Sequence, residues 1–359
     1  MIPAKNYINR RAKLAQSVEQ PMIVLAGSDQ IQRSSDDVYE FHQDGYFYYL
    51  TGIDEPGWTL VMDVKKGREF LIAAEESAYN NPEWQEMDTI EDIKTKTGID
   101  DVRIRRDGWA YIRKSAENYQ SIGSLVPKQR FIRPYGMFIN PAKVQLVERL
   151  RRLHSDANLI DIGADIRSLR GVKEPEEIEE IRKSIAITKL GFDNFVKEFD
   201  TYKDEAEIVS DFDYIFTRNG ATQGYHPIVA SGPRTALAHY KKNTAKIEDD
   251  HIIQLDIGAC QNRYSADISR VYEVGNPTQR HRDIIQAVHE SFDEAINYLK
   301  PGITMRAWEM HIEQFIGTKL NQLGLIDTML RQDIRKFYPH AISHHLGVDL
   351  HDSCDYVTK

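Results

Sequence analysis

The pattern of apolar positions predicts short strands mixed with helices in the first part of the chain. Apolar runs bounded by Gly, Pro and Asp indicate strands, and they lie at residues 22–27, 47–52, 58–64 and 69–74. Apolar side chains at helical spacing indicate helices, and they lie at residues 8–18, 90–97 and 141–154. We therefore expect an α/β domain at residues 1–165, which is an ordinary domain length.

The second part of the chain, residues 166–359, has a different order of elements. Four amphipathic helices are predicted from apolar spacing and from capping residues, at residues 175–196, 208–220, 278–299 and 305–323. Strand-like segments stand between the second and third helices, at residues 226–231, 252–257 and 264–274. Two helices, strands and two further helices indicate an α+β domain, because a doubly wound sheet would alternate strictly.

Composition narrows the class of protein. Hydrophobic residues make up 41% and charged residues 28%, as in soluble globular proteins. The net charge of −9 argues against a nucleic-acid surface. Cys260 and Cys354 are too few for a disulfide framework, which favours a reducing compartment, and neither stands in a nucleophile motif. With no signal-peptide pattern and no membrane-length apolar run, we expect a cytoplasmic protein with no membrane partner.

The segment 252–272 places two carboxylates between apolar neighbours. If Gln261 and Asn262 form a two-residue turn, counting outward puts Asp256 opposite Asp267. Their Cβ atoms would then be roughly 4.5–5.5 Å apart. Two like charges near a core require a shared proton or a cation, and a divalent cation suits an oxygen-rich face. The alternative is a different register that leaves both acids on a solvated edge.

Histidines concentrate near the end of the chain, where four of the twelve lie between His340 and His351. His239 stands upstream, in Leu-Ala-His-Tyr. Histidine is the usual nitrogen ligand of a catalytic metal and the usual proton shuttle near neutral pH. Ordinary hydrogen bonding could also account for any single one of them, but the cluster together with the paired acids favours a functional site.

These segments resemble the aminopeptidase P and prolidase family, the "pita-bread" metallopeptidases. LDIGACQNRYSADISRVY resembles the stretch in which two aspartates, here Asp256 and Asp267, bind two metals. HAISHHLGVDLHD resembles the histidine segment whose central histidine, here His344, is a metal ligand. RSSDDVYEFHQDGYFYYLTGIDEPG is similar to the amino-terminal domain of bacterial aminopeptidase P. The resemblance implies a second domain with the pita-bread fold, also called creatinase/aminopeptidase-like.

The resemblance also implies an activity. Peptides with proline in second position would lose their N-terminal residue to a hydroxide that bridges two divalent metals, commonly manganese. By the same match, His340 and His351 contact substrate or assist the transition state, and ASGPRTALAHY makes His239 another active-site residue. A homodimer or homotetramer is implied as well. Two alternatives stay open, namely a prolidase restricted to dipeptides and an inactive or peptide-binding pita-bread module.

One departure from the family concerns its remaining metal ligands. The family completes its site with two glutamates on strands after the histidine segment, and this chain ends at Lys359 before either could appear. We therefore expect a C-terminally truncated part of a longer protein, with the last strands missing and the glutamate ligands beyond Lys359. We also expect the 359-residue chain to be inactive by itself.

Overall fold

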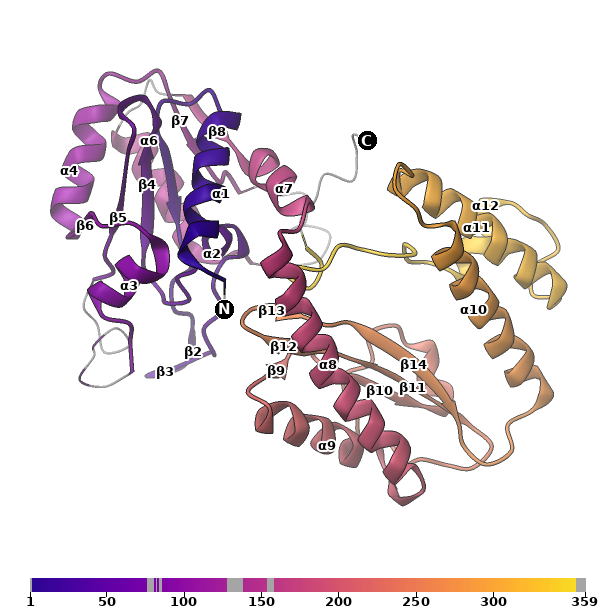
Figure 1. Ribbon diagram of the computed structural model, residues 1–359. Coiled ribbons are helices and arrows are strands. Elements are labelled where there is room, and N and C mark those ends of the chain that lie inside the picture. The colour runs from indigo at the N-terminus through magenta and orange to yellow at the C-terminus, as the bar shows by residue number, and fades with distance from the viewer. Residues whose placement is uncertain are drawn as a thin grey trace. The chain divides into compact units, whose positions relative to one another are not determined.

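The computed structural model describes residues 2–75, 81, 83, 86–127, 138–153 and 158–352. The chain forms two compact units, Met1–Val172 and Lys173–Lys359 (Figure 1). Helix α7 (Gly163–Gly171) spans the domain boundary expected at residue 165 and packs against α1 (Ala4–Ser17) in the first unit. No helix in the described part of the chain is both long and apolar enough to cross a membrane.

The first unit is built on a six-stranded mixed sheet with the order β6–β5–β4–β1–β7–β8. Its strands are β1 (Ile23–Ala26), β4 (Thr59–Asp63), β5 (Arg68–Ile72), β6 (Val102–Arg103), β7 (Ser121–Ser124) and β8 (Asn158–Asp161). β4 runs antiparallel to both β1 and β5, and the other pairs are parallel. β2 (Gln32–Ser34) and β3 (Asp37–Val38) form a separate exposed hairpin.

The described residues of this unit also form the helices α2 (Gly45–Thr51), α3 (Ile90–Thr97), α4 (Arg105–Ala116) and α6 (Pro141–Leu153), and η1 (Val64–Lys66) is a short 3₁₀ turn. The core joins apolar side chains of β1, β4 and β5 to those of α4 and α6, including Val24, Val61, Phe70, Trp109 and Leu146. The predicted helices at 8–18, 90–97 and 141–154 correspond to α1, α3 and α6, although residue 154 lies outside the described residues.

The strand predicted at residues 47–52 is wrong, because these residues lie in helix α2. The Asp44 side chain accepts a hydrogen bond from the Phe47 backbone N–H at 3.1 Å and caps the helix. Gly52, at φ 72°, ends it in the left-handed conformation. α2 is buried on every side, so its apolar run has no periodicity that separates a helix from a strand. The strands predicted at 22–27, 58–64 and 69–74 are confirmed as β1, β4 and β5.

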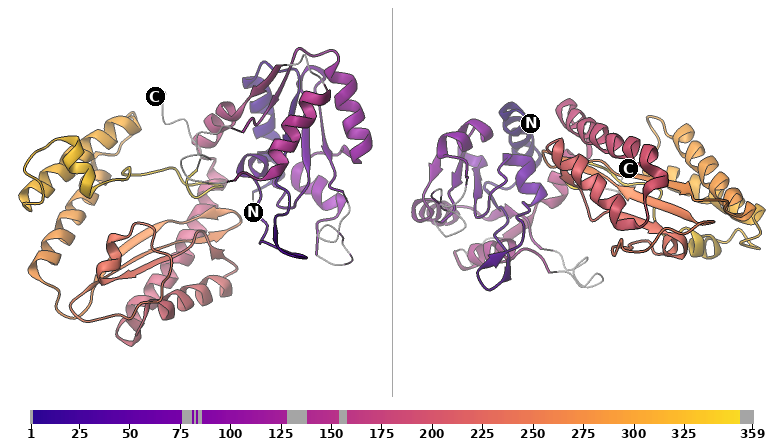
Figure 2. Two further views of the ribbon diagram at one scale, coloured as in Figure 1. Left: turned by 180° about the vertical axis from the view of Figure 1, so that it is seen from behind. Right: turned by 90° about the horizontal axis from the view of Figure 1, so that it is seen from below.

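The second unit packs two long helices against an antiparallel sheet (Figures 1 and 2). α8 (Pro175–Glu198) and α9 (Glu205–Arg218), joined through η2 (Phe199–Thr201), cover one face of β10 (Ile228–Ser231), β11 (Ile252–Ile257) and β14 (Ile268–Glu273). The helices approach closely at Gly191, where a Cβ would lie 2.5 Å from the Phe212 ring. A smaller sheet, β13–β12–β9, contains β9 (Thr222–Gln223), β12 (Ala259–Gln261) and β13 (Tyr264–Ser265).

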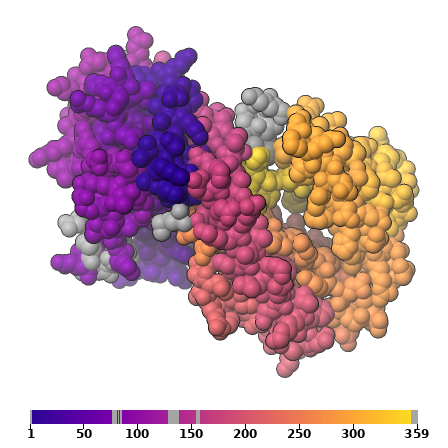
Figure 3. Space-filling view, in the orientation of Figure 1, coloured from indigo at the N-terminus to yellow at the C-terminus, as the bar shows by residue number. Residues whose placement is uncertain are grey.

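Up to residue 352, three further helices follow the sheet. They are α10 (Gln279–Tyr298), which is orange in Figure 3, α11 (Met305–Gln322) and α12 (Arg331–Phe337). α10 packs on α11, and α11 packs on α12. The predicted order of two helices, strands and two helices is confirmed, with α12 as an addition. The fold is thus an α/β unit followed by an α+β unit, as the sequence predicts.

Candidate metal centre

The hairpin of the two aspartates turns at Asn262 and Arg263, one residue later than predicted. Both residues have positive φ, 51° and 71°, as a tight type I′ turn requires. Cys260 therefore pairs with Ser265, and Asp256 pairs with Ser269 instead of Asp267. The predicted register is wrong by two positions, because Asn262 tolerates the left-handed conformation and takes the first place in the turn.

The shift by two positions leaves both aspartates on the same face of the hairpin, because side chains alternate with period two. The Tyr225 hydroxyl donates to Asp256 Oδ1 at 2.5 Å and lies 3.2 Å from Asp267 Oδ1. Next to Tyr225, the Gly224 N–H donates to the carbonyl of Gly258 at 2.8 Å. The structure thus brings the two carboxylates together through a tyrosine that the sequence analysis missed. A single tyrosine after a glycine carries no pattern that could have revealed it.

Gly258 lets the two strands of the hairpin approach at the aspartates. A Cβ at this position would lie 1.8 Å from the carbonyl oxygen of Ala266 and 2.6 Å from its carbonyl carbon. These are backbone atoms, so a side chain could not be accommodated by rotamer changes alone. The close approach fixes Asp267 beside the strand that carries Asp256.

His344 presents a ring nitrogen to the acidic pair. Its Nε2 lies 3.0 Å from Asp267 Oδ2, and its Nδ1 lies 3.0 Å from the His345 carbonyl oxygen. The carbonyl and the carboxylate can both only accept, so the protonated ring donates from both nitrogens, and loss of the Nε2 proton would leave a lone pair for a cation. His351 lies beside His344, with ring centroids 4.3 Å apart and the rings tilted by 57°. Ligand atoms of Asp267, His344 and His351 lie within 4.8 Å of one another.

The electrostatics of these groups follow from their burial and proximity. Burial, and then the charge of Asp267, raises the pKa of Asp256. Burial also acts to raise the pKa of Asp267, but the hydrogen bond and charge of His344 outweigh it and lower that pKa. The bond to Asp267 raises the pKa of His344 in turn. Burial, followed by the two carboxylate charges, raises the pKa of Tyr225, so its hydroxyl stays protonated.

These observations show that the donor set fits a divalent cation. Two carboxylates and one imidazole nitrogen lie together in a half-buried place, where the repulsion between the carboxylates is expensive without a positive charge. The Nδ1 hydrogen bond of His344 is the usual way in which a protein fixes the tautomer of a metal-binding histidine. Asp256, Asp267 and His344 are the residues that would hold it.

The other two predicted histidines pair with each other. The rings of His239 and His340 have centroids 5.9 Å apart. His239 also lies within electrostatic reach of His351, whose pKa is lowered by burial first, then by the charges of His344 and His239. The His340 segment is held from α11 and α12, because Arg335 donates to the His340 carbonyl at 2.7 Å and Glu309 accepts from the Ile342 N–H at 2.7 Å.

Comparison with protein-family models now gives the class of protein. Residues 179–359 match the model of metallopeptidase family M24, and residues 7–122 match the model of the aminopeptidase P N-terminal domain. The chain belongs to metallopeptidase family M24, as the resemblance implied, and divalent metal ions belong to the chemistry of that family.

Individual relatives agree with this class. The chain is 27% identical over 345 residues to a probable Xaa-Pro aminopeptidase of Aspergillus fumigatus, in a match that covers 93% of this chain and 68% of that protein. Among solved structures, it is similar to aminopeptidase P from E. coli in its low-pH form, with a TM-score of 0.83, 22% identity and coverage of 99% of this chain and 83% of that one. It is also similar to proline aminopeptidase P II from Yersinia pestis, with a TM-score of 0.80, 23% identity and coverage of 99% and 84%. The second unit therefore has the pita-bread fold.

Proposed function

We propose that this chain carries the metal ligands of a peptidase that removes the N-terminal residue from peptides with proline in second position. The observation that carries the proposal is the convergence of Asp256, Asp267 and His344 in one half-buried place. The match to an aminopeptidase P N-terminal domain and the names of the relatives support the proline specificity. The rival within enzymes is a prolidase, and the rival outside them is a peptide-binding module without turnover.

The ligand chemistry favours two Mn²⁺-like ions. Carboxylate oxygens with a single imidazole suit harder cations than the nitrogen and sulfur sites of structural zinc. When bound, such ions polarise a carbonyl oxygen and make a bound water more acidic. Tyr225 supplies a permanent proton donor to the outer side of the two carboxylates, and this would orient their remaining lone pairs toward the metals.

The surrounding histidines would handle charge on the substrate. Because burial and nearby charges lower the pKa of His351, its ring is neutral near pH 7 and keeps one N–H. That N–H would donate to the scissile carbonyl as negative charge develops on its oxygen. His239 and His340 form the second pair and would bind the peptide or protonate the departing proline nitrogen.

The test is hydrolysis by the protein expressed from its complete reading frame, stripped of metal and then supplied with Mn²⁺. Ala-Pro-Ala, Ala-Pro and Ala-Ala-Ala separate the alternatives. Release of alanine from Ala-Pro-Ala, with little from Ala-Ala-Ala, is the expected result. Cleavage of Ala-Pro alone would indicate a prolidase. If none of the three peptides is cut, the peptidase proposal is wrong.

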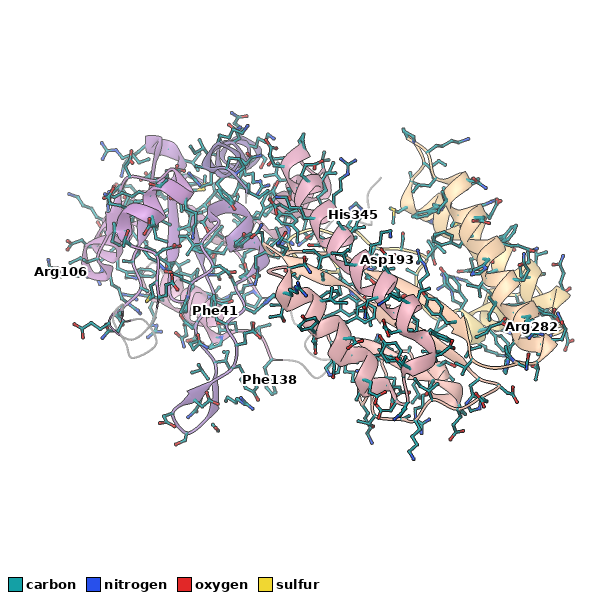
Figure 4. All side chains as sticks on the ribbon, turned by 60° about the horizontal axis from the view of Figure 1, so that its bottom comes forward. Phe41, Arg106, Phe138, Asp193, Arg282 and His345 are labelled. Atoms are coloured by element: carbon teal, nitrogen blue, oxygen red, sulfur yellow. The ribbon has the colours of Figure 1, made fainter. Side chains whose placement is uncertain are left out.

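The ligand assignment has a separate test in metal binding. Asp267→Asn removes one ligand charge and the partner of His344, and loss of supporting residues alone already weakens metal sites by about 10–100-fold. We expect Mn²⁺ affinity by calorimetry to fall by at least that factor, and turnover to fall with it. Asp193→Asn is the matched control, because Asp193 is exposed on α8 and pairs with Lys189 (Figure 4). Equal Mn²⁺ affinity in the two variants would show that the site is misplaced.

A further inference from the structure

A small cavity in the first unit lies far along the chain from the metal ligands and has no role in the function proposed above. It encloses about 70 Å³ and opens at one edge of the six-stranded sheet. Ala26 ends β1 there, Ile72 ends β5, and Thr59 begins the antiparallel strand between them. The carboxyl ends of parallel strands are the common place for ligands in open α/β sheets.

The cavity contains the carboxylate of Asp29, and the backbone of Asp29 is held by two hydrogen bonds to the Asn140 side chain. The Asp29 N–H donates to Asn140 Oδ1 at 3.0 Å, and Asn140 Nδ2 donates to the Asp29 carbonyl at 2.8 Å. Among the described residues, the Asp29 carboxylate itself has neither a hydrogen bond nor an ion pair. Burial raises its pKa, and the charge of Arg105 opposes that effect. Asp29 is thus a positioned acidic group without a protein partner.

The guanidinium of Arg149 lines the same cavity. Arg149, on α6, lies over the Trp109 ring with its Cζ 3.8 Å from the ring centroid. Within the described part of the chain no carboxylate forms a direct ion pair with Arg149. Arg105 also lines the cavity, but its Nε is 3.0 Å from Glu75 Oε1. Burial and the charge of Arg105 lower the pKa of Arg149, although the charge of Glu75 opposes them.

Asp29 and Arg149 therefore line one cavity with opposite charges and do not pair with each other. A purely structural role would favour a direct ion pair, because unpaired charges in partly buried places lose hydration without compensation. We propose that this cavity binds the head group of a free α-amino acid, with the ammonium on Asp29 and the carboxylate on Arg149. A guanidinium suits a carboxylate because its planar fork can donate two parallel hydrogen bonds.

The size and the lining of the cavity limit the ligand further. The cavity of about 70 Å³ is small, which favours a compact ligand such as glycine or alanine. Trp58, Trp109 and Ile72 supply apolar walls that suit a short aliphatic side chain. Larger amino acids would fit only with the side chain directed toward solvent.

The first experiment measures ligand preference with the 359-residue chain. Glycine and L-alanine are titrated by calorimetry and by thermal shift, beside N-acetylalanine, which lacks the ammonium, and alaninamide, which lacks the carboxylate. We expect saturable binding of both free amino acids and at least tenfold weaker binding of both capped compounds. Absence of saturable amino-acid binding, or equal binding of the capped compounds, overturns the proposal.

The second experiment assigns the two charges. Asp29→Asn and Arg149→Gln should each weaken L-alanine binding at least tenfold. Arg106→Gln is the control, since Arg106 pairs with Asp107 at the periphery of the first unit and is labelled in Figure 4. Inorganic phosphate separates a zwitterion site from a plain anion site. The zwitterion proposal is wrong if phosphate binds as tightly as L-alanine and if Asp29→Asn leaves both affinities unchanged or increases them. Circular dichroism melting verifies that each variant is folded.

Discussion

The buried carboxylate of Glu205 gives the sharpest test of how the second unit holds its histidines. Glu205 begins α9, has no exposed surface and accepts four hydrogen bonds. Oε1 accepts from the Ser231 N–H and hydroxyl, both at 2.8 Å. Oε2 accepts from the Tyr240 hydroxyl at 2.8 Å and the Ala245 N–H at 2.9 Å. One side chain therefore ties the end of β10 to the loop that follows His239.

Replacing Glu205 by glutamine removes the charge and keeps the shape. Either orientation of the amide directs an NH₂ group at two donors, and one of them is a backbone N–H that can only donate. Leaving that group unsatisfied costs about 1–3 kcal/mol. The surviving bonds lose their charge assistance, which roughly halves their strength. We expect the free energy of unfolding of the second unit to fall by about 2–4 kcal/mol.

The assay combines urea denaturation with hydrogen exchange of residues 228–231 and 240–246. Exchange should accelerate most in these two segments, because Glu205 connects them. Glu207→Gln is the matched control on the same helix, since the exposed Glu207 accepts one hydrogen bond, from the Lys203 N–H. Equal denaturation midpoints and equal exchange in the two variants would refute the reasoning.

Two further predictions concern a buried acid and a glycine. The hydroxyls of Tyr111 and Tyr119 donate to fully buried Asp63 at 2.7 and 2.8 Å. Although burial opposes them, these bonds lower the pKa of Asp63. A carboxyl whose pKa is lowered by folding stabilises the folded state at pH values above its ordinary pKa of about 3.9. This stabilisation is lost as the pH falls through the folded-state pKa. Asp63→Asn should therefore lower the denaturation midpoint at neutral pH, and its deficit should shrink in acid; a deficit independent of pH would contradict this. Gly258→Ala should destabilise the second unit by about 3 kcal/mol or more, since its Cβ meets backbone atoms of Ala266, and an unchanged melting temperature would show that the strands separate easily.

The sequence predicts the long helices of the second unit because the apolar residues of each helix lie along one side of it. α9 buries Ile208, Phe212 and Phe216 along one side, and helical spacing reveals that stripe. α10 has an apolar stripe at the same spacing, but its Phe292 and Ile296 side chains are exposed. α2 fails this test, since burial all round removes the periodicity. In that case Asp44 and Gly52, the two capping residues, were the better signal.

The candidate site is predictable to a similar degree. Asp256, Asp267 and His344 could be recognised from apolar flanks, clustering and family resemblance, and the structure brings them together. The turn position could not be derived, because Asn262 can occupy either place in a two-residue turn and only the backbone conformation decides. Tyr225 reaches the aspartates from the segment directly after β9, which pairs with β12 of the hairpin, and the Gly224 N–H bonds to the Gly258 carbonyl beside it. Such long-range contacts leave no local pattern.

The type I′ turn at Asn262 and Arg263 has a consequence for how this hairpin can vary in length. Pairing offset by an even number of residues preserves which side of the ribbon each side chain occupies. Relatives could therefore gain or lose one residue on each strand at the tip and still keep Asp256 and Asp267 on the same side of the ribbon. Loss of a single residue between them would send one carboxylate to the opposite side unless a bulge absorbed it. Length variation at the tip should accordingly occur in steps of two.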